Sequence, residues 1–166
     1  MRPWFKVLCL FVACAGFAAD DIRGFWKVIS EEGKTQCIIA IYDYDGLCYG
    51  RIIGSFDETG KKMIDTIERP VKRASGIASK PYYSGLDIIW DLIDSGSKFK
   101  GKIMDPQKGD VYNAELWVDG TALVVRGKLF FFGRSQTWLP ASKSDFPTDF
   151  KQPDVSTFVP AVYDEN

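Results

Sequence analysis

The chain has 166 residues, which suits one domain with short additions, and 46% of them are hydrophobic, enough to fill a core. Its formal net charge of −1 lacks the strong basic excess typical of nucleic-acid-binding proteins. The chain contains no histidine, which excludes Ser-His-Asp and Cys-His catalysis, histidine-ligated zinc and the most common general acid–base side chain.

The first residues are typical of a secretory signal. Two positive charges precede an apolar run from Val7 to Ala15, and the small residues Gly16 and Ala18 follow. This order predicts a signal peptide over residues 1–18, cleaved after Ala18. A run of roughly 12 apolar residues is also too short to span a bilayer, which needs about 20. Cleavage leaves 19 basic and 22 acidic side chains, a net charge of −3. We therefore expect an exported protein, periplasmic or extracellular, with no transmembrane segment after signal removal.

The same segment allows a second interpretation. Phe11 to Cys14 loosely resembles a lipobox, in which Cys14 is the lipidated residue. A lipoprotein anchored at Cys14 is therefore the alternative to a cleaved, unmodified chain.

Short runs of alternating apolar and polar residues follow the signal and predict strands. The predicted strands are Ile22–Ile29, Gln36–Tyr42, Leu47–Ile53, Leu86–Ile93, Lys98–Met104, Val111–Val118, Ala122–Lys128 and Arg134–Leu139. The less regular stretch 57–85 is compatible with a further strand at Met63–Glu68 and a short helix within residues 72–80. About eight short strands joined by tight turns predict an all-β domain, an antiparallel barrel or sandwich.

The first hairpin also bears on the cysteines. Asp45-Gly46 favours a tight turn, and pairing Tyr42 or Tyr44 with Leu47 places Cys37 opposite Ile52 or Gly54. Cys48 then lies roughly 13–20 Å from Cys37 along the strand direction. A disulfide requires Cα atoms within about 7 Å. We therefore predict that Cys37 and Cys48 are free thiols.

Prolines and aromatic residues interleave after residue 140. The prolines are Pro140, Pro147, Pro153 and Pro160, and the aromatic residues are Phe146, Phe150, Phe158 and Tyr163. This spacing prevents a regular helix or strand and predicts extended chain, either disordered or laid over the domain. The expected organisation is a signal peptide at 1–18, a β domain at 19–139 and a proline-rich tail at 140–166.

Several motifs, in order and at similar spacing, resemble one bacterial family. They are Gly24-Phe25-Trp26, Ile41-Tyr42, Leu47 to Ile52, Lys100 to Pro106, Gly109, Tyr112, Leu116, Leu123 to Gly127 and Gly133 to Trp138. Over about residues 23–139 the chain resembles the exported family called domain of unknown function 2147. The resemblance implies a lipocalin-like, calycin-type β-barrel of about eight strands, and no particular activity. Members often carry cysteines near positions where this chain has Tyr44 and Lys128, and only Cys48 remains here, so the resemblance gives no support for a family disulfide in this chain.

The resemblance also implies how the barrel is closed. Gly24 and Trp26 match the G-x-W pattern that starts lipocalin barrels, where the Trp closes the narrow end and a late-strand basic side chain packs across its ring. Arg126 and Arg134 are the candidates for that basic residue, and Trp138 is the further residue assigned to closure.

A basic segment stands out against the acidic background. Residues 61–80 contain six basic side chains (Lys61, Lys62, Arg69, Lys72, Arg73 and Lys80) and only two acids, Asp65 and Glu68. The segment could attract an acidic head group at the barrel mouth, or it could be a solvated loop face.

Three functional hypotheses remain at this point. The first is a carrier of a small apolar ligand, with Trp90, Trp117, Phe99, Ile103 and Tyr112 lining the interior. The alternative is an envelope protein-interaction module whose barrel is filled by side chains; large inward residues on every strand would favour it. The third is an enzyme that uses carboxylates, tyrosines or lysines. The sequence assigns no catalytic residue, metal site or cofactor.

Overall fold

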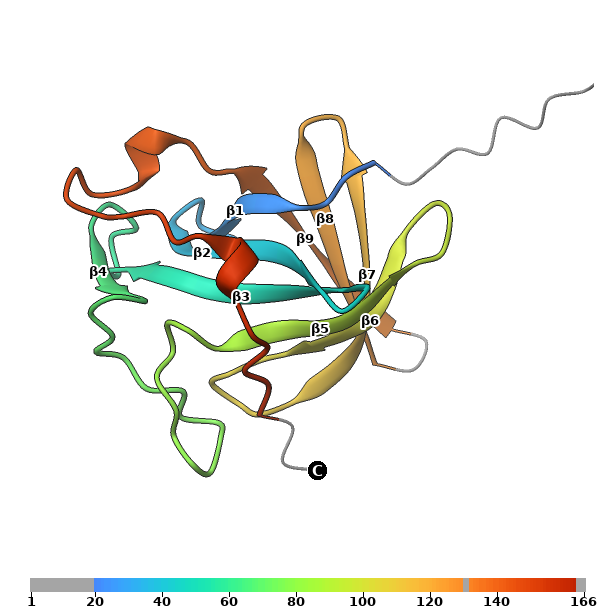
Figure 1. Cartoon of the computed structure of the whole chain (residues 1–166), viewed down its shortest axis with the longest axis horizontal. Coiled ribbons are helices and arrows are strands. Elements are labelled where there is room, and N and C mark those ends of the chain that lie inside the picture. Colours follow the sequence, from blue (N-terminus) through green and yellow to red (C-terminus); the bar gives the residue numbers. More distant parts are fainter. Residues whose placement is uncertain (1–19, 130–131, 164–166) are drawn as a thin grey trace, which may run out of the picture.

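The computed structural model describes residues 20–129 and 132–163, and in this part the chain forms one antiparallel sheet closed into a barrel (Figure 1). The strands are β1 (Gly24–Ile29), β2 (Thr35–Tyr44), β3 (Leu47–Phe56), β4 (Met63–Thr66), β5 (Asp87–Asp94), β6 (Phe99–Met104), β7 (Val111–Asp119), β8 (Ala122–Leu129) and β9 (Phe132–Pro140). Their order is β2-β1-β9-β8-β7-β6-β5-β3-β4, and pairing of β2 with β3 closes the ring. The predicted eight-stranded barrel is confirmed, and β4 is a short extra strand on β3.

Inward-facing side chains fill the barrel. Alternation places Phe99, Gly101 and Ile103 inward and Lys100 and Lys102 outward. Large inward residues with at most 2% exposure come from six strands: Ile39, Ile41, Ile52, Ile89, Leu92, Leu116, Leu123, Val125 and Trp138. Phe99, at 4%, adds a large side chain from β6. Trp26, 7% exposed, adds a large side chain from β1. The interior is therefore occupied by the protein's own side chains.

The β2–β3 hairpin turns at Asp45 and Gly46, whose φ angles are 49° and 80°. These positive values explain the Asp-Gly pair. Tyr44 pairs with Leu47, but a bulge between Ile38 and Ile39 moves Cys37 opposite Ser55, one residue beyond the predicted partner. Cys37 and Cys48 are both free and buried, so the predicted thiols are confirmed.

Residues 67–86 form a long loop, and the helix expected within residues 72–80 is wrong. The buried carboxylate of Asp65 accepts hydrogen bonds from the backbone N–H groups of Val71 and Lys72 and from the hydroxyl of Ser84. Gly76 then packs directly on the turn after β6, where its N–H donates to Pro106 O at 3.1 Å. These tertiary bonds hold the backbone in an irregular path that a helix could not follow.

The tail lies over the outer side of the barrel. Figure 1 shows it, in orange to red, passing in front of β2 and β3. It carries two short 3-10 helices, Lys143–Asp145 and Val155–Thr157. Phe146 packs edge-on against Phe25, with ring centroids 6.2 Å apart, and Phe158 packs edge-on against Tyr42 at 5.1 Å. The tail thereby covers an apolar strip on the outer face of β2 and β3, formed by Ile38, Ala40 and Ile53.

None of the helices in the described ranges is long and apolar enough to cross a bilayer. The predicted signal peptide, including Cys14, lies outside the described residues.

Candidate functional site

The structure separates the five residues expected to line a ligand cavity. Phe99, Ile103 and Tyr112 face inward, and Ile103 pairs directly with Tyr112 across β6 and β7. Trp117 faces outward, with the ammonium of Lys98 4.2 Å from its ring centroid, so its assignment to the interior is wrong. The reason is the two-residue period of a strand, which places positions 112 and 117 on opposite faces. Trp90 is 5% exposed at a bulge of β5.

Barrel closure differs from the expected pattern in the basic residue, because neither candidate arginine packs across the ring of Trp26. Trp26 and Trp138 are buried at 7% and 1% exposure, and the Trp26 indole N–H donates to Ile22 O at 2.8 Å. Gly24 begins β1 with a φ of 129°. Arg126, however, pairs with Glu115 on the outer face, because its neighbour Gly127 faces inward toward Ile103 and Tyr112. Arg126 therefore does not pack across Trp26.

Arg134 does not reach Trp26 either. It pairs with Gly127, whereas Trp26 pairs with Pro140. Six residues of strand separate positions 134 and 140, roughly 20 Å at 3.3 Å per residue.

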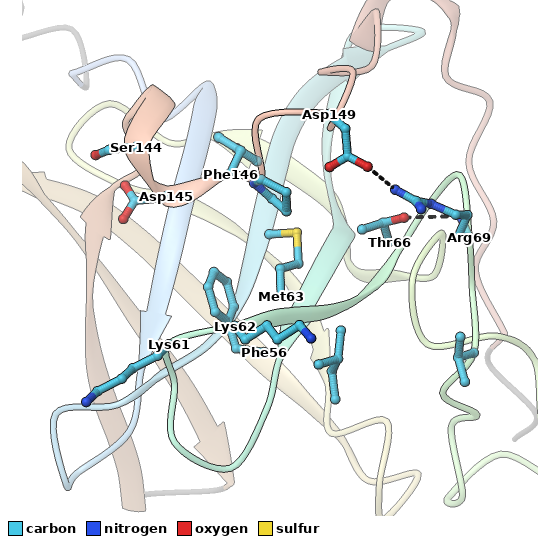
Figure 2. A pocket seen from close by; sticks show the side chains of 13 residues that line it. Phe56, Lys61, Lys62, Met63, Thr66, Arg69, Ser144, Asp145, Phe146 and Asp149 are labelled. Atoms are coloured by element: carbon cyan, nitrogen blue, oxygen red, sulfur yellow. Dashed lines mark hydrogen bonds and ion pairs between the residues drawn. The ribbon is translucent and has the colours of Figure 1, made fainter.

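A groove of about 660 Å³ lies outside the barrel, between β4 and the first half of the tail (Figure 2). The lining residues are Phe56, Lys61, Lys62, Met63, Ile64, Thr66, Arg69, Val71, Ser144, Asp145, Phe146, Pro147 and Asp149. Its volume falls in the range of about 300–1,000 Å³ that small-molecule sites occupy.

The floor of the groove is apolar. Met63, 8% exposed, points toward Phe146 of the tail in Figure 2, with Phe56 beside it. Met63 packs so closely on β3 that a Cβ at Gly54 would lie 2.6 Å from its sulfur, so Gly54 makes this packing possible. Ile64 and Val71 continue the apolar surface to the solvent edge, where they are 53% and 71% exposed.

Cationic side chains surround this floor. Lys61, Lys62 and Arg69 all line the groove and are exposed. Arg69 bonds Asp149 of the tail at 2.9 Å, and this hydrogen bond lowers the pKa of the Asp149 carboxyl. The other tail carboxylate, Asp145, lies 2.9 Å from the ammonium of Lys27. Burial raises the pKa of Asp145, but the Ser142 N–H and Lys27 outweigh it and the net shift is downward.

Both walls of the groove have identifiable supports. Asp65, on the strand that carries Met63, holds the following loop through the N–H groups of Val71 and Lys72. On the other side, the tail leaves β9 with Ala141 N–H donating to Phe25 O at 2.8 Å. Phe146 and Phe150 then stack, with ring centroids 5.1 Å apart.

The basic segment 61–80 of the sequence already indicated that Lys61, Lys62 and Arg69 could attract an acidic head group. Sequence reasoning missed the tail side of the groove, because Arg69 and Asp149 are 80 residues apart and no local pattern joins them. Across the described ranges, no three Cys, Asp or Glu side chains gather as a metal site would require. The arrangement can bind an apolar body and attract a negative charge beside it.

Comparisons with known proteins agree with this architecture. The model of an uncharacterized protein family conserved in bacteria (DUF2147) matches residues 24–139. A search of curated proteins found no match. Among solved structures, the chain is similar to HP1028 from the human pathogen Helicobacter pylori, which is described as belonging to the lipocalin family. The TM-score is 0.60 at 18% identity, over 75% of this chain and 86% of that one, so the similarity shows a lipocalin-like fold.

Proposed function

The chain belongs to the bacterial family DUF2147, and from that premise we propose that it is an exported, non-enzymatic binding protein for a small amphipathic ligand with an acidic head group. The ligand would lie in the groove between β4 and the tail rather than inside the barrel. The observation that carries the proposal is the groove itself, where an apolar floor of Phe56, Met63 and Phe146 meets three exposed cationic side chains.

The filled interior supports a site outside the barrel. A ligand inside would have to displace side chains such as Ile39, Ile89 and Leu116, which have no exposed surface. Removing packed side chains from a core costs several kcal/mol, about 2–5 for each large aliphatic residue. The groove requires no such displacement.

Charge is expected to decide the affinity. Burial contributes about 0.8 kcal/mol per methylene, so a chain of roughly eight methylenes gains about 6 kcal/mol. Association itself costs about 4 kcal/mol or more, which offsets most of that gain. The attraction of an anionic head group by Lys61, Lys62 and Arg69 supplies the remainder and selects an acid over a neutral amphiphile.

The first experiment is native mass spectrometry of the protein purified gently from its own cells. An added mass that disappears on denaturation and belongs to an acidic amphiphile supports the proposal. A protein mass lacking residues 1–18 supports export, whereas a chain beginning with a lipid-modified Cys14 would assign a membrane anchor.

A titration with dansyl-labelled undecanoic acid then tests the site. Ile64→Glu places a negative charge at the groove and should weaken binding about tenfold or more, because the charge repels the head group and the apolar edge is lost. The matched control is Ile93→Glu, a change at a similarly exposed isoleucine (59%) on β5, away from the groove. Equal affinities for both variants, or equal binding of the neutral methyl ester, would contradict the proposed site.

The filled barrel also favours a second candidate, a protein-interaction module of the cell envelope. Large inward residues come from every barrel strand, the arrangement expected for a barrel that holds no internal ligand. A bare monomer mass from the native cells, together with no uptake of dansyl-undecanoic acid, would reject the ligand-binding proposal and favour this candidate.

A further inference from the structure

The outer wall formed by β6, β7 and β8 is strongly cationic. The charged residues in the middle of its outer face are Lys100, Lys102, Glu115, Arg126 and Lys128, together with Lys98, which directly precedes β6. Five cations thus accompany a single carboxylate, Glu115, in the middle of this face, on a chain whose formal net charge is −1. We call these six residues the basic wall. Acidic residues mark its limits: Asp94 ends β5 and the outward-facing Asp119 ends β7 on one side, and Asp105 and Asp110 lie in the turn between β6 and β7 on the other.

The cations form two rows. Lys98, Lys100 and Lys102 alternate along one strand direction, so their Cα atoms are about 7 Å apart. Arg126 and Lys128 lie two strands away, at about 10 Å. The charge is therefore spread over a broad surface instead of converging on one point.

Internal pairing neutralises only part of this charge. Glu115 bonds both Lys98 and Lys128, and its pKa is lowered chiefly by the hydrogen bond from Lys128. Lys102 donates to the neutral amide of Asn113 at 2.7 Å. Arg126 stands directly opposite Glu115, yet its shielded Nε donates no hydrogen bond within the described part of the chain.

Apolar side chains lie among the cations. Ile93 pairs with Lys100 and is 59% exposed. Trp117 is half-buried between the two rows, beneath the ammonium of Lys98. Tryptophan with lysine and arginine is the composition that favours a membrane–water interface.

We propose that the basic wall docks the protein on an anionic phospholipid surface. A two-dimensional array of lipid phosphates matches two separated rows of cations better than a single head group does. In the closed strand order β7 is four strands from β2 in either direction, so the wall is on the side of the barrel opposite the face that the tail covers. Docking would therefore leave the groove open to solvent.

The test uses the mature chain and two kinds of vesicle. We expect binding to vesicles of phosphatidylglycerol and phosphatidylcholine, weakening steeply as salt is raised, and none to phosphatidylcholine alone. The variant Lys100→Gln with Lys102→Gln removes two exposed charges and should lower the partition coefficient about 25-fold, since each basic residue near an anionic membrane contributes roughly fivefold.

The matched control is Lys61→Gln with Lys62→Gln, which changes the net charge equally but at the groove. It should bind vesicles within about twofold of the parent chain while losing affinity for dansyl-undecanoic acid. The two proposals can thus fail separately. Equal loss of vesicle binding in both double variants would overturn the inference, as would no binding of the parent chain to anionic vesicles. Binding to a soluble anionic polysaccharide but not to vesicles would overturn it in favour of a glycan partner.

Discussion

Arg51 and Asp87 form a buried ion pair that joins the barrel wall to the tail. The Nη2 atom of Arg51 lies 2.6 Å from Oδ2 of Asp87, and the two side chains are 9% and 0% exposed. Each partner also bonds the tail backbone, Arg51 through Val159 O and Asp87 through the N–H of Ala161. The hydroxyl of Tyr42 donates to the same carboxylate, and burial, with the nearby Asp87 charge, raises the pKa of Tyr42.

Asp87→Asn is expected to lower the free energy of unfolding by about 3 kcal/mol, because it leaves the Arg51 charge buried without its counter-ion. Urea denaturation measures this loss, and limited proteolysis should show faster cleavage near residues 159–163. Asp94→Asn, at the exposed end of the same strand, is the control and should change little. The double variant Arg51→Met with Asp87→Leu should be more stable than Asp87→Asn, since it leaves no unpaired charge. A single variant as stable as the parent chain would show that the pair is unimportant.

Gly76→Ala should detach the long loop from the turn after β6. A Cβ at Gly76 would lie 2.2 Å from the backbone nitrogen of Gly109, a contact that backbone atoms cannot relieve without moving. We expect a loss of about 1–3 kcal/mol, measured by thermal or urea unfolding. Gly127→Ala is the matched control, because its Cβ would meet its nearest neighbour at an ordinary 3.7 Å. Equal stability of the two variants would contradict the loop packing.

The two thiols should be unreactive in the folded protein. Burial raises the pKa of Cys37 and of Cys48 to about 12, so almost no thiolate is present at pH 8. Ellman's reagent should therefore modify both thiols rapidly in denaturant and neither at a comparable rate in the native state. Rapid modification of the native protein would show that one of these sites opens to solvent.

Much of the barrel could be predicted because its signals are local. Alternation, together with the turns at Asp94 to Ser97, Asp105 to Gly109 and Asp119-Gly120, identifies β5 to β9 within a few residues. The bulge at Ile38 has no such signal, since it depends on how β2 bends against β3. The helix expected within residues 72–80 failed for a related reason, because Asp65 and Gly109 determine that path from elsewhere in the chain.

The candidate site was predictable only in part. The cluster of basic residues beginning at Lys61 was visible as a charge contrast, whereas the contribution of Phe146 and Asp149 depended on where the tail folds back. The alternation of side chains along residues 111–118 could have placed Trp117 on the outer face of the barrel. Tyr112 and Trp117 are an odd number of residues apart and cannot share a face of a regular strand.

Glu115 should add stability that depends on pH. Its pKa is lowered in the folded state, mainly by the hydrogen bond from Lys128, so its contribution is present above the ordinary value of 4.5 and is lost as pH falls through the lower folded value. Glu115→Gln should cost about 1 kcal/mol at pH 7 and progressively less below pH ~4. Urea denaturation across this range checks it, with Asp119→Asn at the exposed end of β7 as the control. A cost that stays constant with pH would rule out the ion pair as its origin.

The apolar strip of Ile38, Ala40 and Ile53 is covered by residues that are synthesised after all the barrel strands. The ribosome synthesises strands β2 and β3 well before Phe146, Phe150 and Phe158. A chain that is cut short before Phe146 therefore leaves this apolar face uncovered. Exposed apolar sheet surface promotes association between chains and attracts proteases and chaperones. Synthesis through the tail is thus needed to cover this face, and a chain interrupted before Phe146 is expected to be more adhesive than one that contains the tail.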